Sequence, residues 1–175
     1  LASNLAASLL LARVAKHLYL DISATWRTDL KTGIERVVRA LVLALLKLAP
    51  KGYRIEPVFL DQRDGQWSYR RACRYTLGLL ECPEIIEDEI IEPVCGDILL
   101  GLDVAGNVLV HADDYGLIKE WSNKGIQIYF LVHDLLPIRM PEVFPPGAEK
   151  SHENWMRVVS KYDGAICVSK AVADD

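Results

Sequence analysis

Residues 125–137 read GIQIYFLVHDLLP. The short apolar run 126–132, bounded by a glycine and by a proline segment, is typical of a buried parallel strand. His133 and Asp134 follow directly at the carboxyl end of that strand. Ligands of open parallel sheets bind beyond these ends, where loops and helix N-termini converge. The stretch therefore predicts a parallel sheet and makes His133 and Asp134 the first candidate site residues.

The rest of the chain alternates predicted strands with predicted helices. Residues 84–92 fit an edge strand or a loop, and the prolines after residue 136 exclude a regular helix before Gly147. The alternation predicts an α/β fold, a Rossmann-like doubly wound parallel sheet with helices on both faces. We expect strands at 17–22, 53–60, 97–102, 126–132 and 164–168, helices at 34–46, 69–80, 113–123 and 148–161, and turns at 64–65 and 105–107.

Composition favours one well-buried domain. The 175 residues are 51% hydrophobic and carry a net charge of -4, with Lys and Arg scattered, so we expect no nucleic-acid partner. The four cysteines lack metal-site spacing and are expected to be reduced thiols. Residues 1–16 predict an upstream amphipathic helix or linker, and residues 17–175 the domain itself. Because both ends look cut, we expect a fragment of a longer protein.

A second candidate segment lies before the helix at 34–46. Its residues Thr32 and Gly33 end a long loop, where backbone N–H groups and a positive helix end could approach a phosphate. Arg36 lies one turn further and could reach a diphosphate or pair with a surface carboxylate. Thr32 as a plain N-cap and Gly33 as a packing residue explain the same sequence, and no complete nucleotide-binding fingerprint is present.

The strand exits allow more than one role for each polar residue. His133 could contact a sugar hydroxyl, act as a general base or anchor a loop through a backbone carbonyl. His133 and Asp134 are both catalytic candidates, but adjacent strand residues point to opposite sides, so one of the two is expected to orient the segment rather than face the cleft. Ser169 and Lys170 follow the last strand, where Ser169 caps the next helix and presents its N-terminus to the same edge.

A metal site is the weaker interpretation of the remaining polar cluster. His111, Asp113 and Asp114 lie at a predicted strand-to-helix junction and could hold a divalent ion together with His133. A carboxylate N-cap of the helix at 113–123 explains them more simply. We therefore predict no metal ligands.

Four motifs in this order resemble the N-terminal half of a GT-B glycosyltransferase, most closely the retaining family 4 enzymes that build bacterial surface polysaccharides such as O-antigen. The resemblance covers the chain from about residue 19 to its end. The motifs are TGIERVVR at 32–39, VHDLLP at 132–137, PEVF at 141–144 and CVSKAVADD at 167–175.

The resemblance implies a hexosyltransferase, expected to transfer mannose with retention from a nucleotide-sugar such as GDP-mannose. It implies a growing polysaccharide or lipid-linked glycan as acceptor, no metal or other cofactor, and a cytoplasmic location with peripheral association at the inner membrane face. Gly33 would approach the donor diphosphate and His133 the transferred sugar. Arg36, Ser169 and Lys170 are weaker correspondences.

The family's second domain, which holds most of the donor, has no counterpart in this sequence. We therefore expect the chain alone to be inactive, because the main cations for the leaving diphosphate would be absent. Two other functions remain open: a non-catalytic Rossmann-like binding or scaffold domain of a polysaccharide-biosynthesis protein, and a small-molecule hydrolase that uses His133 and Asp134.

Overall fold

The computed structural model describes residues 15–31, 33–83 and 86–175. Within these residues, six strands form one sheet in the order β3-β2-β1-β4-β5-β6. The predicted upstream helix lies outside the described residues except for Ala15 and Lys16, and Lys16 already begins β1. The strands are β1 Lys16–Asp21, β2 Tyr53–Arg63, β3 Gln66–Arg71, β4 Ile98–Gly101, β5 Gln127–Val132 and β6 Gly164–Cys167.

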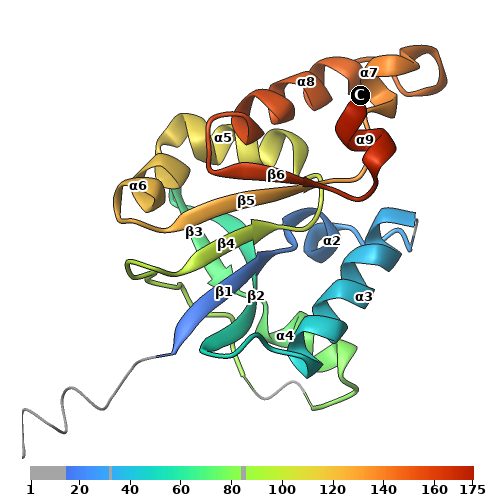
Figure 1. The fold of residues 1–175 in the computed structure, drawn as a ribbon. Helices are drawn as coiled ribbons and strands as arrows, with labels where there is room; N and C mark the ends of the chain where they lie inside the picture. The colour runs from blue at the N-terminus through green and yellow to red at the C-terminus, as the bar shows by residue number, and fades with distance from the viewer. Residues whose placement is uncertain (1–14, 32, 84–85) are drawn as a thin grey trace, which may run out of the picture.

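Helices cover both faces of this sheet, as predicted. In Figure 1, α3 and α4 lie on one side of the strands, and α5, α6 and α8 lie on the other. The Rossmann-like class is therefore confirmed, with helix–sheet–helix layers around two apolar cores. The helices are α2 Ser23–Arg27, α3 Gly33–Lys47, α4 Cys73–Leu79, α5 Gly106–Tyr115, α6 Leu117–Asn123, α7 Leu136–Arg139, the 3-10 turn η1 Pro141–Val143, α8 Ala148–Val159 and α9 Lys170–Asp174.

The strand order reverses direction beside β1. From β1 the chain moves through α3 to β2 on one side, whereas β4 pairs with the other side of β1 and the chain continues to β5 and β6. All of these pairs are parallel, so the carboxyl ends of β1, β4, β5 and β6 share one edge of the sheet. This edge, beside α2 and α9 in Figure 1, is where ligands of such folds bind.

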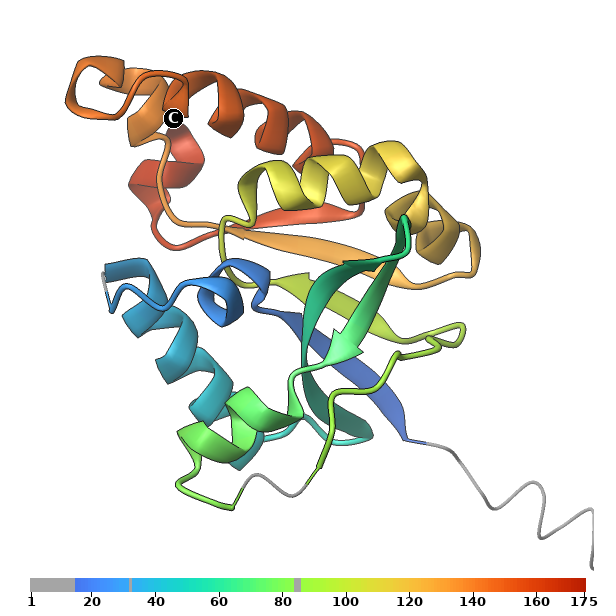
Figure 2. The same ribbon diagram turned by 180° about the vertical axis from the view of Figure 1, so that it is seen from behind.

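One edge strand departs from the predicted parallel sheet. β2 continues beyond β1 and turns back at Asp64 and Gly65 into the antiparallel strand β3, which Figure 2 shows from behind. Both turn residues have positive φ, 50° and 78°, the geometry that two-residue hairpins favour. The turn was predicted, but the helix expected from residue 69 was wrong there, because Tyr69 is buried in β3 and α4 begins only at Cys73.

The helix after β4 begins earlier than expected. The predicted turn at 105–107 is instead the start of α5, whose Leu109 and Ala112 are buried against the sheet. The predicted helix 113–123 is divided at Gly116, which has φ of 98° and separates α5 from α6. Because a left-handed residue cannot continue a helix, the chain changes direction there.

The remaining segments fit the expectations. Within the described part of 84–92 the chain is a loop that touches the sheet through one bridge, between Ile90 and Arg70. The proline segment forms only α7 and η1 before α8 begins at Ala148. All four cysteines are free thiols. In the parts of the chain that the structure describes, every helix is too short or too polar to cross a bilayer.

Candidate functional site

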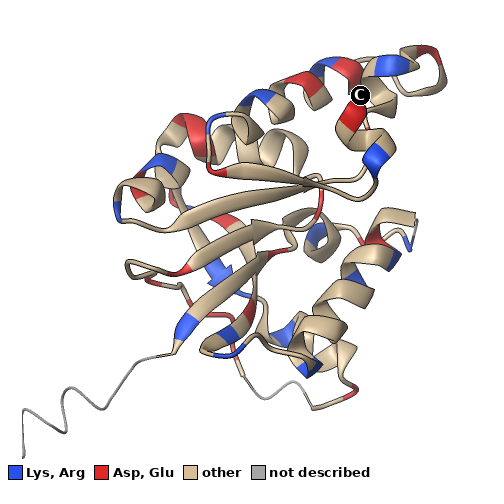
Figure 3. Cartoon of the chain, in the orientation of Figure 1, with Lys and Arg blue, Asp and Glu red and all other residues tan. Residues whose placement is uncertain are grey.

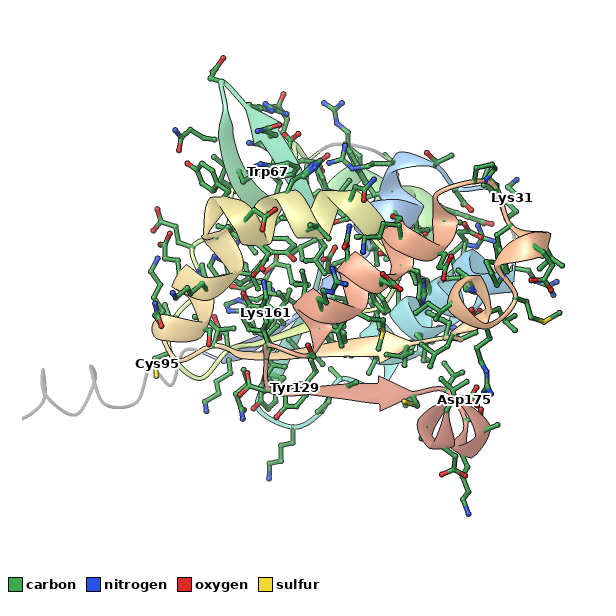
Figure 4. The ribbon with its side chains drawn as sticks, turned by 90° about the horizontal axis from the view of Figure 1, so that it is seen from above. Lys31, Trp67, Cys95, Tyr129, Lys161 and Asp175 are labelled. Atoms are coloured by element: carbon green, nitrogen blue, oxygen red, sulfur yellow. The ribbon has the colours of Figure 1, made fainter. Side chains whose placement is uncertain are left out.

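The predicted site residues follow strands that end at one side of the molecule. Figure 4 shows Lys31, in the loop before α3, and Asp175, at the end of α9, at one end of the molecule, with Cys95 at the other. His133 follows β5 and Ser169 follows β6 at this same edge. The topology thus brings the predicted segments to one edge, where the N–H of Val168 after β6 also donates to the carbonyl oxygen of Val132 at the end of β5, at 3.1 Å.

His133 is buried behind the exit of β4. Its Nε2 lies 2.7 Å from the carbonyl oxygen of Leu102, the residue that directly follows β4. A carbonyl oxygen only accepts, so Nε2 carries the proton in this contact, and in the neutral ring Nδ1 is then an acceptor. Loop anchoring, one of the roles considered for His133, is therefore observed. The same bond fixes the ring and leaves Nδ1 as the atom that can receive a hydroxyl.

Asp134 shapes the backbone after β5. Its Oδ1 accepts from the N–H of Leu136 at 3.0 Å, which satisfies a donor at the start of α7. Its own backbone hydrogen-bonds to His152 of α8, and burial lowers the pKa of that histidine. His152 is thereby favoured in its neutral form. One residue of the pair is predicted to orient this segment, and both His133 and Asp134 make such contacts here.

The segment at the start of α3 is open to solvent. Thr32 lies outside the described residues. Gly33 is exposed, and a Cβ built on it would meet nothing within 4 Å, so the alternative of a packing glycine is wrong. Arg36 is exposed and, in the described residues, ion-pairs with no carboxylate. Both Gly33 and Arg36 are therefore accessible to a ligand.

The end of the chain contributes a cap and one cation. Ser169 accepts a hydrogen bond from the N–H of Val172 at 3.3 Å, which confirms it as the N-cap of α9. Lys170 is exposed in the first turn of this short helix. Arg139 of α7 ion-pairs with Asp175 and ties α9 to the segment that follows His133. The contact holds the exits of β5 and β6 together.

The polar cluster considered as a metal site has a different role. His111, Asp113 and Asp114 lie within α5, not at a strand exit, so a helix N-cap at Asp113 is wrong. Asp113 is buried and receives bonds from Lys161, at 2.6 Å, and from the hydroxyl of Tyr162. These bonds join α5 to the end of α8. Among the described residues, no group of three or more His, Cys, Asp or Glu side chains is placed to hold a metal ion.

Sequence reasoning missed a buried carboxylate at the centre of this edge. Asp21, the last residue of β1, is 2% exposed and accepts from the Ser23 N–H at 2.9 Å, from the Ser23 hydroxyl, and from the Tyr69 hydroxyl at 2.8 Å. Ser23 in turn accepts from the N–H of Leu60 at 2.8 Å. Three strands, β1, β2 and β3, are therefore joined through one carboxylate.

A second buried carboxylate lies beside it. Asp103, two residues after β4, is 3% exposed, and its Oδ2 accepts from the N–H of Thr25 at 2.8 Å. Its Oδ1 has no hydrogen-bond partner among the described residues. Burial, and then the charge of Asp21, raise the pKa of Asp103 to about 7. Burial also raises the pKa of Asp21, against its three hydrogen bonds.

Carboxylates with shifted pKa values are typical of functional sites, and ligands often bind where the strand order of a parallel sheet reverses. Structural networks of buried polar groups also produce such pKa shifts. The signal was present in the sequence. Asp21 and Asp103 each follow an apolar strand in the same way that His133 does. What the sequence does not show is that β1 and β4 are neighbours, which places both carboxylates together.

The chain was compared with protein families, solved structures and curated proteins. No family model matches the chain, and no solved structure matches it significantly. Three curated proteins do match, each a serotype-specific mannosyltransferase WbdA of Escherichia coli. Two are 30% identical over 164 residues, or 93% of the chain, and one is 31% identical over 161 residues, or 91% of it. The chain spans 19% of the length of these relatives.

The matches cover more than nine-tenths of the chain. The resemblance that the four motifs predicted is thereby confirmed in kind, since the relatives are named as mannosyltransferases of a serotype-specific type. The chain is thus related, over more than nine-tenths of its length, to one segment of the serotype-specific mannosyltransferases of Escherichia coli.

Proposed function

We propose that this chain is the acceptor-side half of a hexosyltransferase that moves mannose, with retention, from a nucleotide-sugar such as GDP-mannose. The acceptor is a growing polysaccharide or a lipid-linked glycan, reached at the inner face of the cytoplasmic membrane. One observation carries the proposal: 93% of the chain aligns with mannosyltransferases at 30% identity. The doubly wound sheet supports it, because its strand exits form the edge where such folds bind substrates.

In the full-length enzyme, this chain would bind the acceptor and a second domain would bind most of the donor. The chain spans only 19% of its relatives, which leaves room in a related protein for a second domain that binds most of the donor. In this proposal the chain alone does not catalyse transfer, because a leaving diphosphate needs cations that the second domain supplies. No metal ion or other cofactor takes part.

During transfer, the bond between the sugar C1 and the diphosphate oxygen breaks, and a bond forms between C1 and an acceptor hydroxyl oxygen on the same face of the ring. The electron pair of the broken bond stays with the diphosphate, whose oxygen takes up the proton that the acceptor hydroxyl loses. Gly33 is the exposed first residue of the 15-residue helix α3, and the dipole of the helix favours negative charge at this end. Arg36 and Lys170 supply nearby cations.

His133 contacts the transferred sugar in this proposal. Its Nε2 is committed to Leu102, so Nδ1 accepts from a sugar hydroxyl and positions the ring. Asp134 orients the backbone that carries His133 rather than touching the sugar. Ser169 contributes through the position of α9.

The test uses the protein in its full natural length, GDP-mannose and a lipid-linked acceptor. Loss of one sugar hydrogen bond should lower kcat/KM of His133→Ala by about 10- to 100-fold, while Tm shows whether the variant is folded. His111→Ala, exposed on α5, is the matched control and should retain activity. NMR of the product should show a retained anomeric configuration.

The main alternative is a non-catalytic binding or scaffold domain, and it is favoured by one observation, that His133 and Asp134 both have structural partners. Full transferase activity in a folded His133→Ala variant, or an inverted product, would contradict our proposal. Hydrolysis of model esters or phosphates that depends on His133 would instead support the hydrolase alternative.

A further inference from the structure

A pocket lies between α2, the loop before α3, α3 itself and α4. Its volume is about 650 Å³, within the range of roughly 300–1,000 Å³ that is usual for small-molecule sites. None of the residues predicted from the sequence to bind a ligand lines it. Its lining residues in the described chain come from α2, the loop before α3, α3 itself and α4: Trp26, Asp29, Lys31, Arg39, Arg74, Tyr75, Gly78 and Leu79.

Cations outnumber carboxylates among the residues that line the pocket: Lys31, Arg39 and Arg74 against Asp29. Asp29 and Arg39 form an ion pair with each other, so together they add no net charge. In the described residues, no carboxylate ion-pairs with the side chain of Lys31 or with that of Arg74. Asp29 and Asp88 accept instead from the backbone N–H groups of these two residues, at 3.1 and 3.2 Å. Figure 3 shows residues of both signs along β2 and α8, for comparison. Lys31 and Arg74 therefore leave this pocket suited to an anion.

Two aromatic side chains give the pocket an apolar surface and an unused hydrogen-bonding group. The ring of Trp26 stacks on Phe59 with centroids 3.6 Å apart and planes at 8°, which fixes its orientation. The hydroxyl of Tyr75 is buried and has no hydrogen-bond partner among the described residues. Buried hydroxyls normally have a partner, so this group indicates a ligand that supplies one.

A glycine keeps one wall of the pocket open. Gly78 lies in α4, where its backbone is helical, and a Cβ built on it would meet nothing within 4 Å. Glycine lowers helix stability by roughly 0.5–1 kcal/mol relative to alanine, and the fold does not require it here. A side chain at this position would extend into empty space beside Tyr75 and Leu79.

We propose that this pocket binds a phosphate-bearing sugar. Lys31 and Arg74 take the phosphate oxygens, the rings of Trp26 and Tyr75 contact the apolar face of the sugar, and the Tyr75 hydroxyl bonds to a sugar oxygen. A phosphate on a lipid-linked glycan and a free sugar phosphate present the same chemistry. Only the choice of mannose as the sugar rests on the proposed function, because the pocket lies outside the segments assigned to the donor.

Binding is measured by titration calorimetry with the full-length protein and no donor present. Mannose 1-phosphate should bind at least about tenfold more tightly than methyl α-mannoside or inorganic phosphate. Only mannose 1-phosphate has both a phosphate for the two cations and a sugar ring for the two aromatic side chains. Lys31→Ala and Arg74→Ala should each weaken it by about three- to tenfold, and more at low ionic strength. Lys47→Ala, exposed at the far end of α3, is the matched control and should bind normally.

The glycine provides a test that does not alter charge. Gly78→Leu should abolish binding of mannose 1-phosphate by filling the open wall, while Gly78→Ala should retain most of it, with Tm unchanged or raised in both. Equal affinity of the wild type and the Lys31→Ala/Arg74→Ala double variant would overturn the proposal, as would tighter binding of GMP than of mannose 1-phosphate. Transfer activity that survives while binding is lost separates this site from the proposed catalytic edge. A glycan carrying a lipid diphosphate that competes with mannose 1-phosphate would identify the acceptor as its source.

Discussion

At the scale of single residues, the buried carboxylate of Asp21 accepts three hydrogen bonds, from the Ser23 N–H, the Ser23 hydroxyl and the Tyr69 hydroxyl. It holds the ends of β1, β2 and β3 together through Ser23 and Tyr69. A carboxylate that is 2% exposed is tolerated only where hydrogen bonds replace its lost water. The Tyr69 hydroxyl is therefore a structural donor, and burial together with the charge of Asp21 raises its pKa well above the usual value.

Tyr69→Phe removes this donor without changing the ring that packs on Trp121, whose centroid lies 4.7 Å away. We expect the free energy of unfolding to fall by about 1–3 kcal/mol, the cost of leaving a buried acceptor unsatisfied. Urea unfolding measures it. Tyr115→Phe is the matched control, because the Tyr115 hydroxyl bonds to Gln66 at the exposed surface, and its effect should stay within about 0.5 kcal/mol. Equal stability losses in the two variants would contradict the role given to Asp21.

The sequence could predict single residues only where local order decides their position. His133, Asp134 and Ser169 were found because each lies within two residues of the end of a strand. The structure gives His133 a carbonyl partner, Asp134 a hydrogen bond from the N–H of Leu136, and Ser169 a capping role. Asp21 and Asp103 follow strands as well. Their importance depends on pairing between β1 and β4, which are far apart in the sequence and which no local pattern reports.

At the scale of elements, the position of β4 depends on a glycine. A Cβ on Gly101 would lie 2.5 Å from Cδ1 of Phe130, a ring that is 1% exposed in the neighbouring strand β5. The ring cannot withdraw because the core around it is filled. β4 therefore approaches β5 closely only because residue 101 has no side chain, and the same strand carries Asp103 to the edge of the sheet.

Gly101→Ala should consequently lower the free energy of unfolding by about 1–3 kcal/mol through overpacking. Chemical denaturation followed by circular dichroism gives the value. In Gly164→Ala, on β6, the added Cβ would meet the Tyr129 ring at 3.4 Å, an ordinary contact, so this control should lose little stability. If the two variants were equally stable, Phe130 would have to be more mobile than the packing indicates.

Elements whose apolar pattern extends over many residues were predictable, and elements with a short or weak pattern were not. The periodic apolar face of α3 and the runs of β1 and β5 matched the structure within a residue or two. β3 was mistaken for helix because six residues give little periodicity, and its strand form depends on pairing with β2 across the 64–65 turn. The start of α5 was missed because Gly106 and Asn107 resemble a turn locally, whereas burial of Leu109 against the sheet favours helix.

At the scale of the whole molecule, the parallel sheet places two carboxylates where neither can be fully hydrated. The end of β1 lies beside the end of β4, so Asp21 and Asp103 interact electrostatically, and ionising both would bury two like charges. The fold thus favours a state in which Asp103 holds a proton near neutral pH. This preference belongs to the topology, since it requires β1 and β4 to be adjacent.

The pH dependence of stability tests this arrangement. The folded-state pKa of Asp103, about 7, lies above its ordinary value of 3.8, so the folded protein binds this proton more tightly than the unfolded chain does. Its stabilising contribution is complete below pH 3.8 and is lost as the pH rises to 7. Asp103→Asn mimics the protonated form and does not titrate. Its carbonyl oxygen can still accept from the Thr25 N–H.

We therefore expect Asp103→Asn to gain stability relative to the wild type as the pH rises from 4 toward 7, by at most about 4 kcal/mol, and the difference to stay constant at higher pH. Urea unfolding of both proteins from pH 4.5 to 8.5 measures it, with Asp114→Asn, exposed on α5, as the control whose curve should run parallel to that of the wild type. Parallel curves for Asp103→Asn as well would show that Asp103 is ionised across this range. The buried charge would then have to be balanced by a ligand or by solvent at the unpartnered Oδ1, since the described residues provide no partner for it.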